Sequence, residues 1–134
     1  MSLYSAIDLP HPPGAHPDWQ ESWVLIFRDR TSGLVGFVRT GAYVNRGTTQ
    51  THWGMALPDG RRFRRIILDR PLEPGDRSES SASSGHVTFS IPNLAYTRFE
   101  AQDADAALDL QLHDFFPSQD WEMIGNSRTH DGDY

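Results

Sequence analysis

The chain has 134 residues, of which 37% are hydrophobic and 22% are charged, and its net charge is −6. This length corresponds to about one domain, and the acidic balance argues against nucleic-acid binding, because nucleic-acid-binding domains are typically basic. With no cysteine, no signal-peptide pattern and no run of about 18 apolar residues, the chain is expected to be a soluble cytoplasmic protein without disulfides or a membrane span.

The first expected element is an extended N-terminal segment, residues 1–20, because four of the nine prolines fall within it. Its two histidines, His11 and His16, have no neighbouring carboxylate or helix that would fix a coordination geometry, so we predict no metal site and no cofactor. The rest of the chain is divided into a β domain, residues 21–125, and a polar C-terminal tail, residues 126–134.

The β domain opens with four predicted antiparallel strands, because apolar and polar residues alternate with a period of two. These strands cover residues 21–28, 34–40, 48–57 and 61–69. The first strand is apolar on both faces, since Trp23 and Leu25 point one way while Val24 and Ile26 point the other. A strand that is apolar on both faces needs cover on both, so we expect a second copy or a second domain to pack on this hairpin.

Residues 70–85 are rich in proline, glycine and serine, and we interpret them as a freely moving excursion at the rim of the fold. Three further strands are predicted at residues 86–91, 96–102 and 107–116. A helix over residues 99–108 is less favoured than a loop, because no apolar stripe with helical spacing is present. The seven short strands predict an all-β fold, an antiparallel meander that forms a lipocalin-like (calycin-type) barrel or half-barrel, with a sandwich as the other possibility.

The stretch ESWVLIFRDRTSGLVGFVRTGAYVNRGTTQTHWGMALPDGRRF combines an E-S-W entry, a G-x-x-G-F-V-R-x-G hairpin and a P-D-G turn. In these features the chain resembles, over roughly residues 16–125, the lipocalin-like proteins related to carotenoid 1,2-hydratase (hydroxyneurosporene synthase) and the AttH-like family. Proteins of that family contain two lipocalin-like halves. The resemblance therefore implies that this chain corresponds to the N-terminal half, that it forms a homo-oligomer or pairs with a second lipocalin-like domain, and that its ligand is a polyene or isoprenoid-like compound.

Three polar residues are candidates for acid–base catalysis. Glu21 begins a strand beside Trp23, where desolvation would raise its pKa, although an ion pair with Arg39 is the preferred interpretation. His52 shares a strand face with a glycine that leaves room for a ligand, but it is also interpreted as a solvent-facing histidine. The same two interpretations apply to His113, which follows polar residues on its face of the last strand.

Five residues are candidate ligand contacts, because aromatic rings supply apolar area and polar tips supply orientation. They are Trp23, Arg39, Tyr43, Asn45 and Trp53. Tyr43 and Asn45 have a second interpretation as hairpin packing and a turn, since the sequence YVNRG contains asparagine and glycine at turn positions.

The basic run RRFRR, residues 61–65, places two arginines on one strand face, and we favour edge protection over phosphate capture for them. Motifs for nucleophilic or nucleotide-driven chemistry are missing from the sequence. The favoured function is binding of a hydrophobic small molecule, such as an isoprenoid, steroid-like or acyl compound, in a β-barrel pocket. Two alternatives are a hydratase, dehydratase, isomerase or cyclase acting on such a substrate, and a structural subunit that docks on a separate chain.

Overall fold

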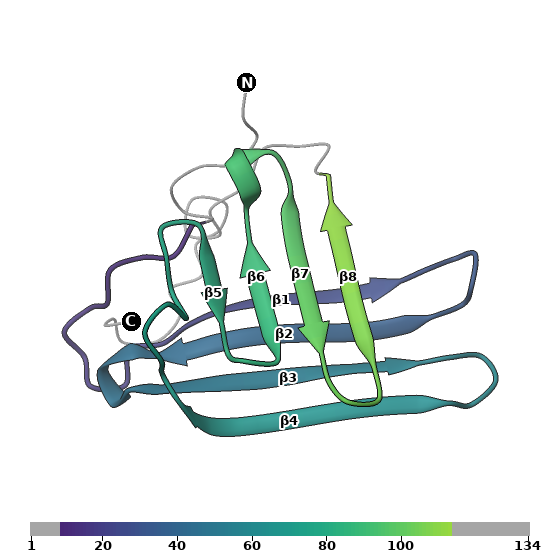
Figure 1. Cartoon of the computed structure of the whole chain (residues 1–134), viewed down its shortest axis with the longest axis horizontal. Helices are drawn as coiled ribbons and strands as arrows, with labels where there is room; N and C mark the ends of the chain where they lie inside the picture. The colour runs from purple at the N-terminus through teal and green to yellow at the C-terminus, as the bar shows by residue number, and fades with distance from the viewer. Residues whose placement is uncertain (1–8, 114–134) are drawn as a thin grey trace, which may run out of the picture.

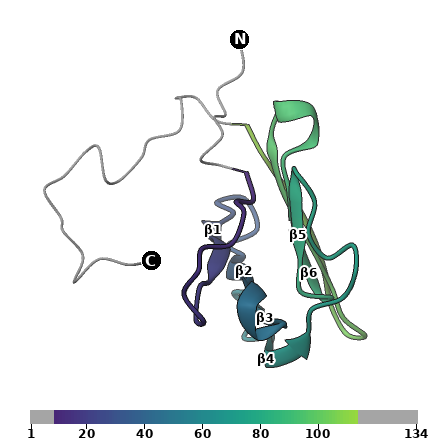
Figure 2. The same cartoon turned by 90° about the vertical axis from the view of Figure 1, so that its left-hand side faces the viewer.

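The computed structural model describes residues 9–113, which form two antiparallel four-stranded β-sheets stacked in two layers (Figures 1 and 2). Each sheet is a meander, with the order β1-β2-β3-β4 in the first and β5-β6-β7-β8 in the second. The strands of the second sheet run across those of the first (Figure 1), as in orthogonally packed sheets. The fold is all-β and antiparallel, as predicted, and the two sheets do not close into a complete barrel.

The first sheet has the longer strands, β1 (Glu21–Arg28), β2 (Val35–Tyr43), β3 (Thr48–Ala56) and β4 (Arg62–Pro71). The second sheet contains β5 (Ser81–Ser83), β6 (Val87–Ser90), β7 (Thr97–Gln102) and β8 (Ala107–Leu112). Two 3-10 turns, η2 (Val44–Arg46) and η3 (Pro92–Leu94), lie in the connections. The less favoured helix near residues 99–108 is replaced by β7, a turn and the start of β8.

The hydrophobic core lies between the two sheets. Trp53 and Val38 of the first sheet are fully buried, and they pack in one cluster with Val87 and Phe99 of the second sheet. Burying a large apolar side chain contributes about 1.5–3 kcal/mol, so this layer supplies the main drive for folding. One face of the first sheet is therefore fixed as the inner face.

The interpretation of residues 70–85 as a freely moving excursion is wrong. This segment contains β5, and Arg70 and Asp76 within it form an ion pair of 2.6 Å. Ser84 is fully buried, and its carbonyl oxygen accepts a hydrogen bond of 3.1 Å from the Thr51 hydroxyl. A polar segment can therefore be an ordered part of the fold when its buried groups find hydrogen-bond partners.

The structure places residues 9–20 before β1 without helix or strand, and they include a turn in which the Trp19 amide donates a hydrogen bond of 3.0 Å to the His16 carbonyl oxygen. The last part of the predicted β domain, residues 114–125, and the predicted tail, residues 126–134, lie outside the described residues. Within residues 9–113 no helix is long and apolar enough to cross a membrane.

Candidate functional site

The outer face of the first sheet, opposite the core, carries large apolar side chains that remain exposed. Ile26 is 81% exposed, Val24 60% and Leu68 53%. These residues alternate along β1 and β4 with inward-pointing neighbours, as the period of two requires. The predicted doubly apolar strand is thus present, and no part of the chain between residues 9 and 113 buries its outer side chains.

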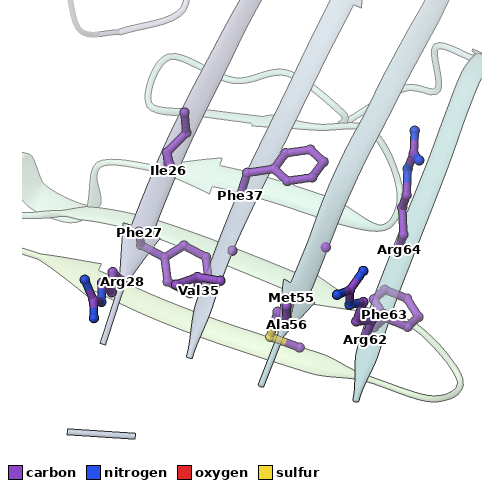
Figure 3. Close-up of a pocket in the computed structure, with 12 residues that line it drawn as sticks. Ile26, Phe27, Arg28, Val35, Phe37, Met55, Ala56, Arg62, Phe63 and Arg64 are labelled. Carbon is purple, nitrogen blue, oxygen red and sulfur yellow. The ribbon is translucent and has the colours of Figure 1, made fainter. Parts of the chain in front are cut away.

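A hollow of about 750 Å³ lies at the end of the first sheet that is farthest from the N-terminal segment (Figure 3). Each of its four strands contributes three consecutive residues to the lining, at positions 26–28, 35–37, 54–56 and 62–64. None of the lining residues comes from the second sheet, which covers the inner face. The hollow is therefore a feature of the first sheet. Four of its lining residues, Phe27, Gly36, Met55 and Phe63, form one row on the inner face, and the other eight are on the outer face, so we place its opening on the outer face.

Two glycines that line the hollow lie where a neighbouring group comes close to the backbone. A Cβ atom on Gly36 would be 2.6 Å from Cζ of Phe27, and one on Gly54 would be 2.8 Å from the carbonyl oxygen of Phe63. The ring of Phe37 lies beside Gly54, with its Cε1 atom 3.5 Å from the same imaginary Cβ. Glycine in a strand often marks such a close approach. The Phe27 ring covers Gly36 on the inner face, and the Phe37 ring lies beside Gly54 on the outer face (Figure 3).

Three arginines, Arg28, Arg62 and Arg64, also line the hollow. Within residues 9–113 none of them is within ion-pair distance of a carboxylate. Strand β4 is at the edge of the sheet, so the predicted edge position of the run RRFRR is confirmed. The alternation of residues in this run predicts that Arg62 and Arg64 share a face, whereas no local pattern selects Arg28 or the apolar lining residues.

His52 and Arg39 lie next to each other on the outer face, directly paired between β3 and β2. Nη1 of Arg39 donates a hydrogen bond of 3.0 Å to Oε1 of Gln50. Burial lowers the pKa of His52 below its usual 6.5, and the charges of Arg39 and Arg64 lower it further. Nε2 of this ring is buried and has no hydrogen-bond partner among the described residues.

Glu21 lies on the inner face at the opposite end of the sheet, and it binds two groups from distant parts of the chain. One of its oxygens pairs with Arg77, and the other is 2.5 Å from Nδ1 of His11. Glu21 therefore forms an ion pair, as predicted. Its arginine partner is Arg77 and not the predicted Arg39, because Arg39 points to the other face. The carboxylate fastens the N-terminal segment to the sheets.

Neither candidate tryptophan lines the hollow. Trp23 stacks on Phe89 of the second sheet with ring centroids 4.9 Å apart, and Trp53 is fully buried in the core. Their predicted role as ligand contacts is corrected to core packing, because the second sheet covers the face from which they project. Aromatic residues are equally suited to both roles, so their type alone does not distinguish them.

Asn45 and Tyr43 lie at the end of the first sheet that is next to the N-terminal segment, away from the hollow. Nδ2 of Asn45 donates to the carbonyl oxygens of Gly14 and His16 at 2.8 and 2.7 Å. The guanidinium group of Arg46 lies 5.2 Å from the centre of the Tyr43 ring. In place of the predicted contact with a ligand, Asn45 therefore holds the N-terminal segment in position.

The candidate acid–base residues do not meet in one site. Glu21 is at one end of the inner face and His52 is on the outer face. His113 follows β8, where its exposed ring lies 5.3 Å from that of Tyr96. Among residues 9–113 no three histidine, aspartate or glutamate side chains are grouped so that they could hold a metal ion.

Comparisons with known proteins identify a family but no activity. A family model described as a domain of unknown function (DUF7064) matches residues 4–132. No curated protein and no solved structure was found to match the chain.

Proposed function

The chain belongs to the DUF7064 family, a domain of unknown function, and we propose that it binds a hydrophobic small molecule in the hollow of its first sheet. The observation that carries this proposal is the largely apolar lining of a space of about 750 Å³. Small-molecule sites typically have volumes of about 300–1,000 Å³ and mostly apolar walls with a few polar groups. An isoprenoid, steroid-like or acyl compound has the apolar surface that such walls would bury.

Catalysis on such a ligand stays a prediction. Of the three acid–base candidates, only His52 is close to the hollow, since it precedes the lining residue Gly54 by two positions on the same face of β3. A hydratase or cyclase would need a second polar group opposite it. Binding requires only the apolar surface, and we therefore favour it over a reaction.

A second copy of the chain is our proposed cover for the outer face. Exposed apolar patches are typical of interaction surfaces. The outer face carries two exposed apolar pairs, Val24 with Ile26 on β1 and Ile66 with Leu68 on β4, at the two edges of the sheet. Packing of two copies across this face would also convert the open hollow into an enclosed one. A second lipocalin-like domain, as the resemblance to the carotenoid 1,2-hydratase and AttH-like proteins implies, is the alternative cover.

The binding proposal is tested with the neutral fluorescent probe N-phenyl-1-naphthylamine. Val35 lines the hollow. Leu94 on η3 has the same exposure of 41% but lies outside the lining, in the connection between β6 and β7. We expect Val35→Asp to weaken probe binding by about tenfold or more, because a charge would be desolvated by the probe, while Leu94→Asp binds as the wild type does. Absence of binding to the wild type, or equal binding by both variants, would contradict the proposal.

The cover is tested by native mass spectrometry at several protein concentrations. We expect a dimer for the wild type and for Leu94→Asp, and a monomer for Ile26→Asp, because the introduced charge would be buried in the interface. A wild-type chain that stays monomeric at every concentration would refute pairing with a second copy, and would favour a separate covering domain.

A further inference from the structure

We infer that the ligand of the hollow is an amphiphile with an anionic head group, bound by Arg62 and Arg64, whose apolar chain lies across the sheet. A long-chain carboxylate is the simplest compound of this class. The inference rests on the proposed function, because it specifies the chemistry of the molecule that the same hollow binds.

Most arginines in the described part of the chain already hold a carboxylate. These ion pairs are Arg46–Asp18, Arg61–Asp59, Arg65–Asp103, Arg70–Asp76, Arg77–Glu21 and Arg98–Asp109. Arg62 and Arg64 stand between two of these paired arginines in the sequence, yet neither has such a partner within residues 9–113. The chain has 18 acidic and 12 basic residues, so a shortage of acidic residues is not the reason.

The charge of the hollow is opposite to the charge of the chain. Its lining contains three arginines and no aspartate or glutamate, whereas the whole chain carries a net charge of −6. Concentrated charge of one sign beside low-dielectric apolar walls attracts ligands of the other sign. The lowered pKa of His52, caused by burial and then by Arg39 and Arg64, agrees with a positive field on this side of the sheet.

The arrangement of the arginines suits a head group at one rim and a chain across the floor. Arg62 and Arg64 point outward from edge strand β4, about 7 Å apart along the strand. Their flexible stems allow both guanidinium groups to reach one carboxylate. Arg28 lies on β1, about 14 Å away across three strand spacings, so it is too distant to share that head group. The apolar side chains of Val35 and Phe37, on β2, lie between the two edge strands (Figure 3).

The test compares decanoate with decanol, which have the same apolar chain and differ in head-group charge. Isothermal titration calorimetry of the delipidated full chain should show that decanoate binds about tenfold or more tightly than decanol, as expected for a charge-assisted contact. Arg62→Gln and Arg64→Gln should each weaken decanoate binding by about fivefold or more, and should leave decanol binding unchanged. Arg30→Gln removes the same charge from an arginine outside the lining and should change neither affinity.

The outcomes separate this inference from the proposed function. Equal binding of decanoate and decanol would overturn the anionic head group and leave hydrophobic binding intact. An equal loss of decanoate affinity in Arg30→Gln would also overturn it, because a general effect of net charge would then explain the result. Failure of the wild type to bind either compound or the neutral naphthylamine probe would overturn both. Thermal melting of the exposed arginine variants should match the wild type, which shows that they fold.

Discussion

The two faces of the first sheet are built from the same four strands, yet one is buried and the other is exposed. On the inner face Trp53 is completely buried, whereas on the outer face Ile26 is 81% exposed. Both side chains are large and apolar, so hydrophobicity does not separate them. The difference is made by the second sheet, which stacks on one face only (Figure 2). Burial is thus a property of the partner surface as much as of the residue.

The arginines of β4 also differ between the two faces, in whether they pair with a carboxylate. Arg65 points to the inner face and binds Asp103 of the β7–β8 turn through two hydrogen bonds of 2.6 and 2.8 Å. Arg64, its neighbour on the outer face, has no carboxylate partner in the described part of the chain. Two successive arginines of one strand therefore have different roles. Arg65 joins the two sheets, and Arg64 lines the hollow.

Among substitutions on the two faces, we expect the loss of Trp53 on the inner face to reduce stability most. Trp53→Ala is expected to lower the free energy of unfolding by about 3–5 kcal/mol, because it leaves a cavity among fully packed side chains. Urea denaturation followed by circular dichroism measures the change. A wild-type midpoint would mean that the inner face is not the core.

A smaller loss is expected from the buried hydroxyl cluster on the inner face. The Ser84 hydroxyl is 3.0 Å from that of Thr40 and 2.7 Å from that of Thr51. Ser84→Ala removes this shared partner and should cost about 1–3 kcal/mol in the same urea assay. Exposed Ser80→Ala provides the control and should be neutral. Equal stability of both variants would show that the cluster does not join the sheets.

The pair between Arg65 and Asp103 should give a pH-dependent difference between the faces. The Arg65 guanidinium lowers the pKa of Asp103 below its usual 3.8. Because the folded pKa is lower than the unfolded pKa, the pair stabilises the fold above about pH 3.8 and loses this effect as the pH falls through the folded value. Asp103→Asn should therefore have a lower Tm than the wild type at pH 7, and the gap should narrow in acid. Exposed Asp105→Asn should show no such gap, and a gap that is constant with pH would contradict the assignment.

We expect the smallest change in stability from a substitution on the outer face, when it is measured on the monomer. Ile26→Ala should change stability by no more than about 0.5 kcal/mol when measured at a dilution where the protein is monomeric, since little buried area is lost. At high concentration the same variant should melt earlier than the wild type, because a covered Ile26 contributes to the dimer. Identical melting at both concentrations would mean that no second copy packs on this face.

Much of the fold follows from local patterns. The alternation in ESWVLIFR predicted β1 at residues 21–28, where it lies. The alternation in RRFRR correctly placed Arg62 and Arg64 together on one face of an edge strand. These successes have one cause, since the period of two in a strand is a property of the backbone and does not depend on distant contacts.

The candidate site was predicted less well, because its members are joined by contacts between distant segments. Glu21 was recognised as an ion-pair candidate, but its partner Arg77 is 56 positions away. The strand β5 lies in a serine-rich stretch. It pairs with β6, and Ser84, which follows it, hydrogen-bonds to Thr40 and Thr51 of the first sheet. The hollow brings together the ends of four strands, and no local pattern marks Phe27 or Met55 as its lining.

Local alternation in the amino-acid sequence is enough to specify antiparallel strands, the side chains that share a strand face, and a first hairpin that is apolar on both sides. The core face, the ion-pair partners of the arginines and the position of the hollow depend on how the two sheets pack. The backbone sets the direction of each side chain locally. Whether that side chain is buried or paired depends on whether the second sheet covers its face.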